Sequence, residues 1–352
     1  MRRIVRLERY SATDRGALGG KNANLGELTR AGLPVPRGFA VTASAYAEAI
    51  QSARLAGELA DLAAAADPAR PETVAEAGRR ARELLASIPW PARLDREVLD
   101  SYAELCRRCA TADVPVAVRS SATCEDLPDA SFAGEHDSYL WVRGADELLS
   151  HIGRCWASLF TDRAISYRRQ LGYPETGLAM SVAVQQMVQP RAAGVAFTLN
   201  PRDGDRSQVA IDASWGFGEA VVSGEVNPDH FLVDKLTGEV GRRIVSRKEV
   251  EFRLTAADRV ERAAVDAARR DVPCLTDAEV KAVAVLARRA ERHFGCPQDV
   301  EWAVDARQPP PGRILLLQSR PETVWSRQPP RRPGSGDYMS GIVGTGAERT
   351  TP

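Results

Sequence analysis

The segment GGKNANLGELTRAG, residues 19–32, places Lys21 after two glycines and at the start of a helical pattern. Lysine is rare here: only four of the 47 basic residues are lysines. Glycines ahead of a helix let backbone N–H groups approach a ligand, and the N-terminus of a helix favours an anion. A lysine there suits phosphate, although the spacing is not that of a Walker A loop. Taken alone, the segment favours a plain turn with a surface lysine.

A second polar segment, VAVRSSATCEDLPDASFAGE at residues 116–135, follows an apolar strand pattern. Arg119 ends the strand, and Thr123 and Gly134 belong to a polar loop of the kind that closes over phosphates. Arginine offers planar, bidentate donors to phosphate oxygens. A structural arginine that pairs with an acidic residue of the same loop explains this segment equally well.

Two further strand patterns, DVEWAVD and RILLLQS, flank a proline-rich turn. If they pair as a hairpin, Glu301 falls opposite Gln318, and Arg320 shares their side. A carboxylate beside an amide oxygen offers hard ligands for Mg²⁺, which usually also keeps waters and substrate phosphates. The competing explanation is a salt bridge from Glu301 to Arg320. A polar pair within so apolar a strand favours the metal.

Another apolar strand pattern ends at Gln186, Met187 and Val188. Backbone groups there could hydrogen-bond an adenine edge while Met187 packs on its face, but an edge strand is an equally good interpretation. The glycines of SWGFGEAVVSGEVNPDHF, residues 214–231, predict a flexible loop near a site. This loop is not a dinucleotide fingerprint, because no following helix and βαβ unit are evident.

The elements that position these residues follow from periodicity. Residues 43–66 and 70–110 are rich in Ala, Arg, Leu and Glu, which predicts a helical region. Strand patterns dominate the second half of the chain. Thr276 and Glu279 predict a capping box at the start of a late helix that Gly295 ends.

Composition excludes several functional classes. The 352 residues predict about two domains, and equal counts of Lys+Arg and Asp+Glu, 47 each, provide no field that attracts nucleic acid or an anionic membrane. With no run of 18 apolar residues and no apolar signal-peptide core, we expect a cytoplasmic protein. Cys106 and Cys109 form a lone CxxC, for which reduced, interior thiols are a better explanation than zinc.

Four segments together resemble the nucleotide-binding domain of the phosphoenolpyruvate synthase and pyruvate phosphate dikinase family, which rifampin phosphotransferase shares. They are GGKNANLGELTRAGLPVPRGFAVT, AVRSSATCEDLPDASFAGE, WGFGEAVVSGEVNPD and the pair DVEWAVD and LLLQSRPET, in family order. The resemblance implies an α+β, ATP-grasp fold of two lobes that holds nucleotide and Mg²⁺ between them. It predicts an N-terminal lobe with a helical segment at 1–190, a C-terminal ATP-grasp lobe at 191–325, and a linker or disordered tail at 326–352.

The resemblance also assigns roles by matching motifs. Lys21, Arg119 and Arg320 are expected to act on the phosphates, and Glu301 and Gln318 to bind Mg²⁺. The residues expected to bind ATP are Lys21, Arg119, Thr123, Gly134, Gln186, Met187, Val188, Glu301 and Gln318. Cys124 and Glu135 depart from the family pattern, where a small residue and glutamine are expected, and Glu135 adds negative charge near the phosphate loop.

In this family, phosphate passes from ATP through a histidine on a swinging domain to an acceptor on a third domain. None of the four histidines here, His136, His151, His230 and His293, lies in the motif that marks the swinging domain. We therefore predict the ATP-binding component of a dikinase-type phosphotransferase, of the pyruvate, water dikinase type. It would convert ATP to AMP with a separate phosphohistidine-domain protein and a small-molecule phosphate acceptor. The alternatives are a self-sufficient small-molecule kinase or ligase and a non-catalytic nucleotide-binding protein.

Overall fold

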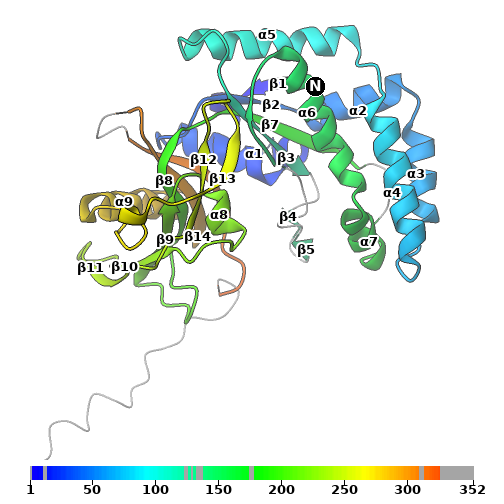
Figure 1. Cartoon of the computed structure of the whole chain (residues 1–352). Coiled ribbons are helices and arrows are strands. Elements are labelled where there is room, and N and C mark those ends of the chain that lie inside the picture. The colour runs from blue at the N-terminus through cyan, green and yellow to red at the C-terminus, as the bar shows by residue number, and fades with distance from the viewer. Residues whose placement is uncertain are drawn as a thin grey trace, which may run out of the picture.

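The computed structural model describes residues 2–10, 14–122, 126–127, 130–131, 138–173, 178–308 and 313–325. The expectations for Thr123, Cys124, Gly134, Glu135 and residues 326–352 fall outside these ranges. Within them, helices and strands form the predicted α+β fold around two main sheets (Figure 1). No helix in the described ranges has both the length and the apolarity needed to cross a bilayer.

The first sheet, here the N-terminal sheet, has the strand order β1-β2-β7-β3-β6. Its strands are β1 (Ile4–Arg6), β2 (Gly38–Val41), β7 (Met180–Gln186), β3 (Val116–Ala122) and β6 (Ser138–Val142). Its apolar face packs on a group of helices, as the right half of Figure 1 shows. These helices are α2 (Ala43–Ser52), α3 (Ala56–Ala65), α4 (Pro71–Ala86), α5 (Ala92–Arg108), α6 (Ala145–Ala157) and α7 (Asp162–Gln170). The helical region predicted for residues 43–66 and 70–110 is confirmed.

The two faces of the N-terminal sheet differ because successive side chains of a strand point to opposite sides. On β7, Val182 and Val184 are fully buried in the core beneath the helices. Ser181, Ala183 and Gln185 alternate with them and point to the other face, where helix α1 (Arg15–Arg30) lies. One face of this sheet therefore stabilises the fold, and the other presents small and polar side chains.

The second sheet, here the C-terminal sheet, has the strand order β11-β10-β9-β8-β14-β15. Its strands are β8 (Pro190–Phe197), β9 (Gln208–Trp215), β10 (Asp229–Asp234), β11 (Val240–Ile244), β14 (Gln298–Asp305) and β15 (Ile314–Pro321). Helix α9 (Asp277–Phe294) covers one face and shares an apolar core with Val300, Trp302 and Val304. The predicted capping box is present at Thr276, and Gly295 ends α9 with a φ of 70°. The opposite face, here the open face, carries Asp299 and Glu301.

The segment between β9 and β14 contains elements that the sequence did not reveal. Strands β12 (Val250–Leu254) and β13 (Val260–Ala264) form a hairpin, and the predicted loop at 214–231 includes helix α8 (Glu219–Val222). The loop passes closely over β12: a Cβ on Gly216, whose φ is 72°, would lie 2.1 Å from the Phe252 carbonyl oxygen. The shorter elements are η1 (Leu7–Arg9), β4 (Asp126–Leu127), β5 (Ala130–Ser131), η3 (Ser158–Phe160) and η4 (Ala267–Arg269).

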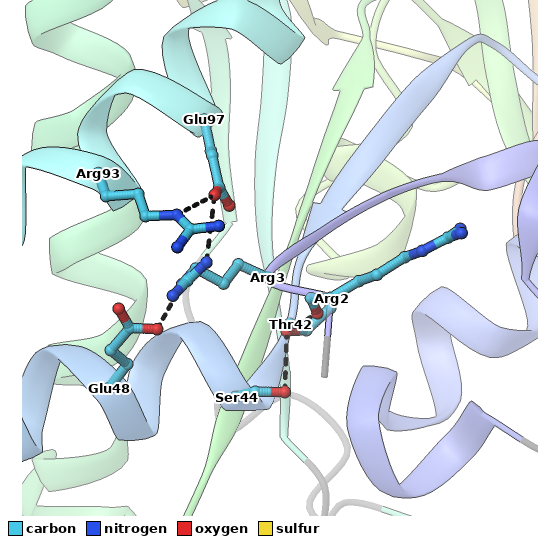
Figure 2. Close-up of polar contacts among 7 residues, drawn as sticks. All are labelled: Arg2, Arg3, Thr42, Ser44, Glu48, Arg93 and Glu97. Carbon is cyan, nitrogen blue, oxygen red and sulfur yellow. Dashed lines mark hydrogen bonds and ion pairs between the residues drawn. The ribbon is translucent and has the colours of Figure 1, made fainter.

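Polar contacts hold the N-terminal strand against the helices (Figure 2). Arg3 pairs with Glu48 of α2 and, at 3.1 Å, with Glu97 of α5. The Thr42 hydroxyl donates a hydrogen bond to the Arg2 carbonyl oxygen at 3.0 Å. Because Arg3 contacts two helices at once, these contacts fix β1 at the edge of the N-terminal sheet.

A fully buried ion pair holds one end of the C-terminal sheet together. The Lys248 ammonium donates to Asp229 Oδ1 at 2.5 Å, and both side chains have no exposed surface. The same carboxylate accepts backbone N–H bonds from Ser246 at 3.0 Å and Cys274 at 2.8 Å. A buried charge that loses its partner is strongly destabilising, whereas a satisfied pair is tolerated.

We predict that Lys248→Met lowers the free energy of unfolding by about 3–5 kcal/mol, because it leaves the Asp229 carboxylate buried without its cation. Urea denaturation measures the difference. Lys281→Met, on an exposed position of α9, is the matched control and should change stability by less than about 0.5 kcal/mol. Equal stability of the two variants would contradict this role for the pair.

Candidate functional site

The polar faces of the two sheets meet at one ion pair. Arg119 lies on β3, and its Nη1 is 3.5 Å from Glu301 Oε2 on β14. The two residues are 182 positions apart in the sequence, and their side chains are only 17% and 21% exposed. The fold thus brings together two residues that the sequence singled out separately.

The predicted pairing of the last two strands is confirmed, since Glu301 lies directly opposite Gln318 in the register of β14 and β15. Arg320 lies opposite Asp299 instead, with its Nε 3.9 Å from Asp299 Oδ2. The competing expectation, a salt bridge from Glu301 to Arg320, is not found among the described residues, because Glu301 pairs with Arg119. The carboxylate and amide therefore lie side by side at the edge of the open face.

Helix α1 carries Lys21 to the same region. Gly19, with φ 67° and ψ 167°, interrupts α1, so a new helical segment begins just before Lys21. The Lys21 ammonium lies 3.5 Å from the backbone carbonyl oxygen of Ser120, the residue after Arg119. The lysine is thus close to Arg119 in space, although the helix itself begins at Arg15.

Two asparagines of α1 fasten both sheets to this helix. The Asn22 amide donates to the Ser181 hydroxyl on β7 at 2.8 Å, and the Asn24 amide donates to the Ser319 carbonyl oxygen on β15 at 2.9 Å. Both asparagines are buried. Because α1 is bonded to the N-terminal sheet and to the C-terminal sheet, it helps to set the position of Lys21 relative to Arg119 and Glu301.

Several buried polar atoms around this junction have no hydrogen-bond partner among the described residues. They are Asn22 Oδ1, Arg119 Nε, Ser121 Oγ, Gln185 Nε2 and Asp299 Oδ1. Buried polar groups are nearly always paired in native proteins, so a group of unpaired ones requires an explanation. The facing walls offer N–H and O–H donors on the N-terminal sheet and a carboxylate oxygen on the C-terminal sheet. This set of atoms suits an anion together with a cation.

Asp299 is a member of this site that the sequence reasoning missed. Burial raises the pKa of its carboxyl group to about 6; the Arg320 guanidinium opposes this shift, and the Glu322 and Glu301 carboxylates add to it. A signal was available in the sequence, because Asp299 precedes Glu301 by two positions and therefore shares its face of the strand.

The segment from Gln186 to Val188 lines a cavity of about 380 Å³. The first two backbone amides of this segment already donate hydrogen bonds within the protein. Gln186 N–H donates to the Arg37 carbonyl oxygen and Met187 N–H donates to the Pro115 carbonyl oxygen, both at 2.8 Å. The Met187 side chain is buried beside Ala117, Trp141 and Phe217. Among the described residues, the Val188 amide has no partner, so it is the backbone donor of this segment that can hydrogen-bond the edge of a purine.

Comparison with known proteins decides the family. The model of the pyruvate phosphate dikinase AMP/ATP-binding domain matches residues 15–337. The chain belongs to this family. The match covers every strand of both sheets except β1 and includes every predicted site residue from Lys21 to Arg320, so the resemblance inferred from the four segments is confirmed.

Curated relatives of this AMP/ATP-binding domain are considerably longer than the chain. A probable phosphoenolpyruvate synthase of Staphylothermus marinus is 42% identical over 92% of the chain and 41% of its own length. The phosphoenolpyruvate synthase of Aeropyrum pernix is 39% identical over 93% of the chain and 43% of its own length. A rifampicin phosphotransferase of a Streptomyces species is 40% identical over 94% of the chain and 37% of its own length. The chain therefore spans less than half of each of these proteins.

The raised pKa of Asp299 predicts a pH dependence of stability. Because its folded pKa of about 6 exceeds the usual value near 4, the folded state binds more protons between these values. The contribution of Asp299 to the free energy of unfolding therefore falls as the pH rises through this window.

We expect Asp299→Asn to remove this dependence and to stabilise the nucleotide-free protein at pH 7 by up to about 3 kcal/mol. Urea denaturation in EDTA at pH 4.5 and pH 7 provides the test, and Asp61→Asn on the exposed side of α3 is the control. If Asp299→Asn had the same stability as wild type at both pH values, the carboxyl group would not be destabilised by burial.

Proposed function

We propose that the chain binds MgATP between its two sheets and serves as the ATP-binding component of a dikinase-type phosphotransferase. The observation that carries this proposal is the contact between Arg119 and Glu301. It places an arginine suited to binding phosphate beside a candidate magnesium ligand. In this interpretation residues 1–190 and 191–325 are the two lobes of an ATP-grasp fold. The family match over residues 15–337 supports it.

The phosphates would be held mainly by side chains of opposite walls. Lys21 and Arg119 approach from α1 and the N-terminal sheet, and Arg320 from the C-terminal sheet. Arg119 provides bidentate donors, and Lys21 provides a mobile point charge. We assign Thr123 and Gly134 to the same phosphates on their motif alone. Phosphoryl transfer depends mainly on positioning and charge neutralisation, which these residues supply without a protein nucleophile.

Glu301 and Gln318 fit a magnesium ion by the chemistry of their oxygen atoms, and Asp299 offers a buried oxygen without a partner among the described residues. No cluster of three or more His, Cys, Asp or Glu side chains within the described ranges could hold a metal by itself. The oxygens of Glu301, Gln318 and Asp299 nevertheless suit Mg²⁺, because this ion binds one or two carboxylates and completes its coordination shell with waters and phosphates. When bound, the ion would neutralise charge on the phosphates.

The adenine would lie against residues 186–188, at the end of β7. Val188 packs with Ala193 and Ala303 and has Leu315 beside it, which gives the base an apolar wall. We therefore keep Gln186, Met187 and Val188 as the adenine-binding segment, with the Val188 amide as the principal donor. The cavity of about 380 Å³ beside them lies within the usual range for small-molecule sites.

Each of the described histidines has a hydrogen-bond partner outside this site. His151 contacts the Glu147 carbonyl oxygen, His230 contacts Asp212, and His293 contacts Glu27. We therefore propose that the phosphate acceptor is a histidine on a separate domain or chain, which passes phosphate to a small molecule. Pyruvate, as in a pyruvate, water dikinase, is the acceptor that the names of the synthase relatives favour.

Product analysis tests this function. With radiolabelled ATP, we expect the isolated chain to bind nucleotide but to form little AMP, because none of the histidines that the structure describes lies at its site. Adding a phosphohistidine-domain protein should raise AMP formation strongly and leave acid-labile phosphate on that protein, and Arg119→Ala should abolish the increase.

Rapid turnover by the chain alone with a small acceptor would contradict the proposal and favour a self-sufficient kinase. Tight ATP binding without turnover under any partner would contradict it as well, and would favour a non-catalytic nucleotide-binding protein.

A further inference from the structure

A row of directly opposed residues crosses the open face of the C-terminal sheet. From β15 to β11 the row is Gln318, Glu301, Val195, Asp212, His230 and Ile244. Directly paired residues of antiparallel strands point to the same side, and neighbouring strands lie about 4.8 Å apart. The Cα atom of Asp212 is therefore about 10 Å from that of Glu301, and the Cα atom of His230 is about 14 Å from it. The far end of this face holds a second polar cluster, apart from the proposed nucleotide site.

The centre of this cluster is a histidine oriented by a carboxylate. His230 Nδ1 lies 2.7 Å from Asp212 Oδ1, and His230 is only 8% exposed. An ionised carboxylate can only accept a hydrogen bond, so it holds the proton on Nδ1. The Nε2 atom has no hydrogen-bond partner in the described part of the chain. The imidazole is thus fixed in orientation with one nitrogen left for a ligand.

His230 and Asp212 line a cavity of about 470 Å³ that is rich in hydrogen-bond donors. Arg202 and Asn227 also line it, and neither side chain has an ion pair or a hydrogen bond among the described residues. Arg247 adds a second guanidinium group, which contacts Asp271 at 3.0 Å and Glu249 at 3.4 Å. Among the described residues that line the cavity, Asp212 is the only carboxylate, and it already accepts from His230. The remaining polar groups therefore favour an oxyanion over a cation.

The loop that bears Arg202 is held in place. Arg202 N–H donates to Asn200 Oδ1 at 3.1 Å, and the Asn200 amide donates to Asp203 Oδ2 at 3.1 Å. The Trp325 indole donates to the Pro201 carbonyl oxygen at 2.9 Å. Because the backbone of this loop is already ordered, binding through Arg202 carries no cost for ordering the loop itself, which favours a specific site.

We propose that this cavity binds a small organic phosphate ester, at a site distinct from that of MgATP. Arg202, Asn227 and His230 would hold the phosphoryl oxygens, with Arg202 providing the fork-shaped donors that match them. Pro201, Pro228 and Ile244 provide an apolar wall for the carbon part of the ester. The cavity is large enough for such a molecule, because small-molecule sites begin at about 300 Å³.

The test titrates the full chain with benzyl phosphate and with inorganic phosphate, without ATP, by calorimetry and by NMR of the histidine Cε1–H signals. His230→Gln identifies the His230 signal. We expect benzyl phosphate to shift this signal and to bind at least about tenfold more tightly than inorganic phosphate, because only the ester has an apolar body to bury. Arg202→Ala should weaken binding about tenfold.

Two variants serve as controls. Arg206→Ala, an exposed arginine of the same loop that does not line the cavity, should bind the ester like wild type. Arg119→Ala, which affects the proposed nucleotide site, should also leave this binding unchanged. The proposal is overturned if Arg202→Ala binds like Arg206→Ala, if Arg119→Ala abolishes binding, or if the ester leaves the His230 signal unmoved. Equal affinities for the two phosphates would overturn the ester as the ligand class.

Discussion

The contact between Arg119 and Glu301 is the constraint on which the arrangement depends, because it requires the polar faces of two sheets to confront each other. Removing charged groups from water is costly unless their hydrogen bonds are completed. Here Arg119 Nε and Asp299 Oδ1 are buried without partners among the described residues. A ligand with negative oxygens and an accompanying cation would satisfy both walls at once. The free-energy cost of leaving these polar groups unpaired and the affinity for nucleotide would then have the same origin.

The stability of the fold comes from the sheet faces that point away from this junction and pack on helices. The N-terminal sheet buries residues such as Val182 against its helices, and the C-terminal sheet buries Trp302 beneath α9. Two separate apolar cores leave the surfaces between the sheets free for polar side chains. Helix α1 joins the two through Asn22 and Asn24, so the GGKNANLG motif positions the sheets as well as Lys21. One helix therefore accounts for the positions of both the lysine and the asparagines beside it.

Much of this was predictable from the sequence where the pattern was local. Alternation on β14 and β15 predicted that Glu301 lies opposite Gln318, and the capping box at Thr276 located α9. The pairing of Arg119 with Glu301 was not predictable by spacing, since 182 residues separate them and only the packing of the two sheets brings them together. Asp299 was missed because a single carboxylate on a strand also reads as solvent-exposed. The hairpin of β12 and β13 was missed because charged residues interrupt both short strands and most of their positions are partly or fully exposed.

The most direct test of the central claim is the affinity of Arg119→Ala for MgATP, measured by calorimetry beside Arg93→Ala. Arg93 lies on α5 with its side chain 75% exposed and pairs only with Glu97 among the described residues, so its removal controls for the loss of an arginine elsewhere. If the phosphates bind between the sheets, Arg119→Ala should weaken MgATP binding at least about tenfold, the value of a charge-assisted contact, and Arg93→Ala should bind like wild type. Wild-type affinity in Arg119→Ala would contradict a nucleotide site at the junction of the two sheets.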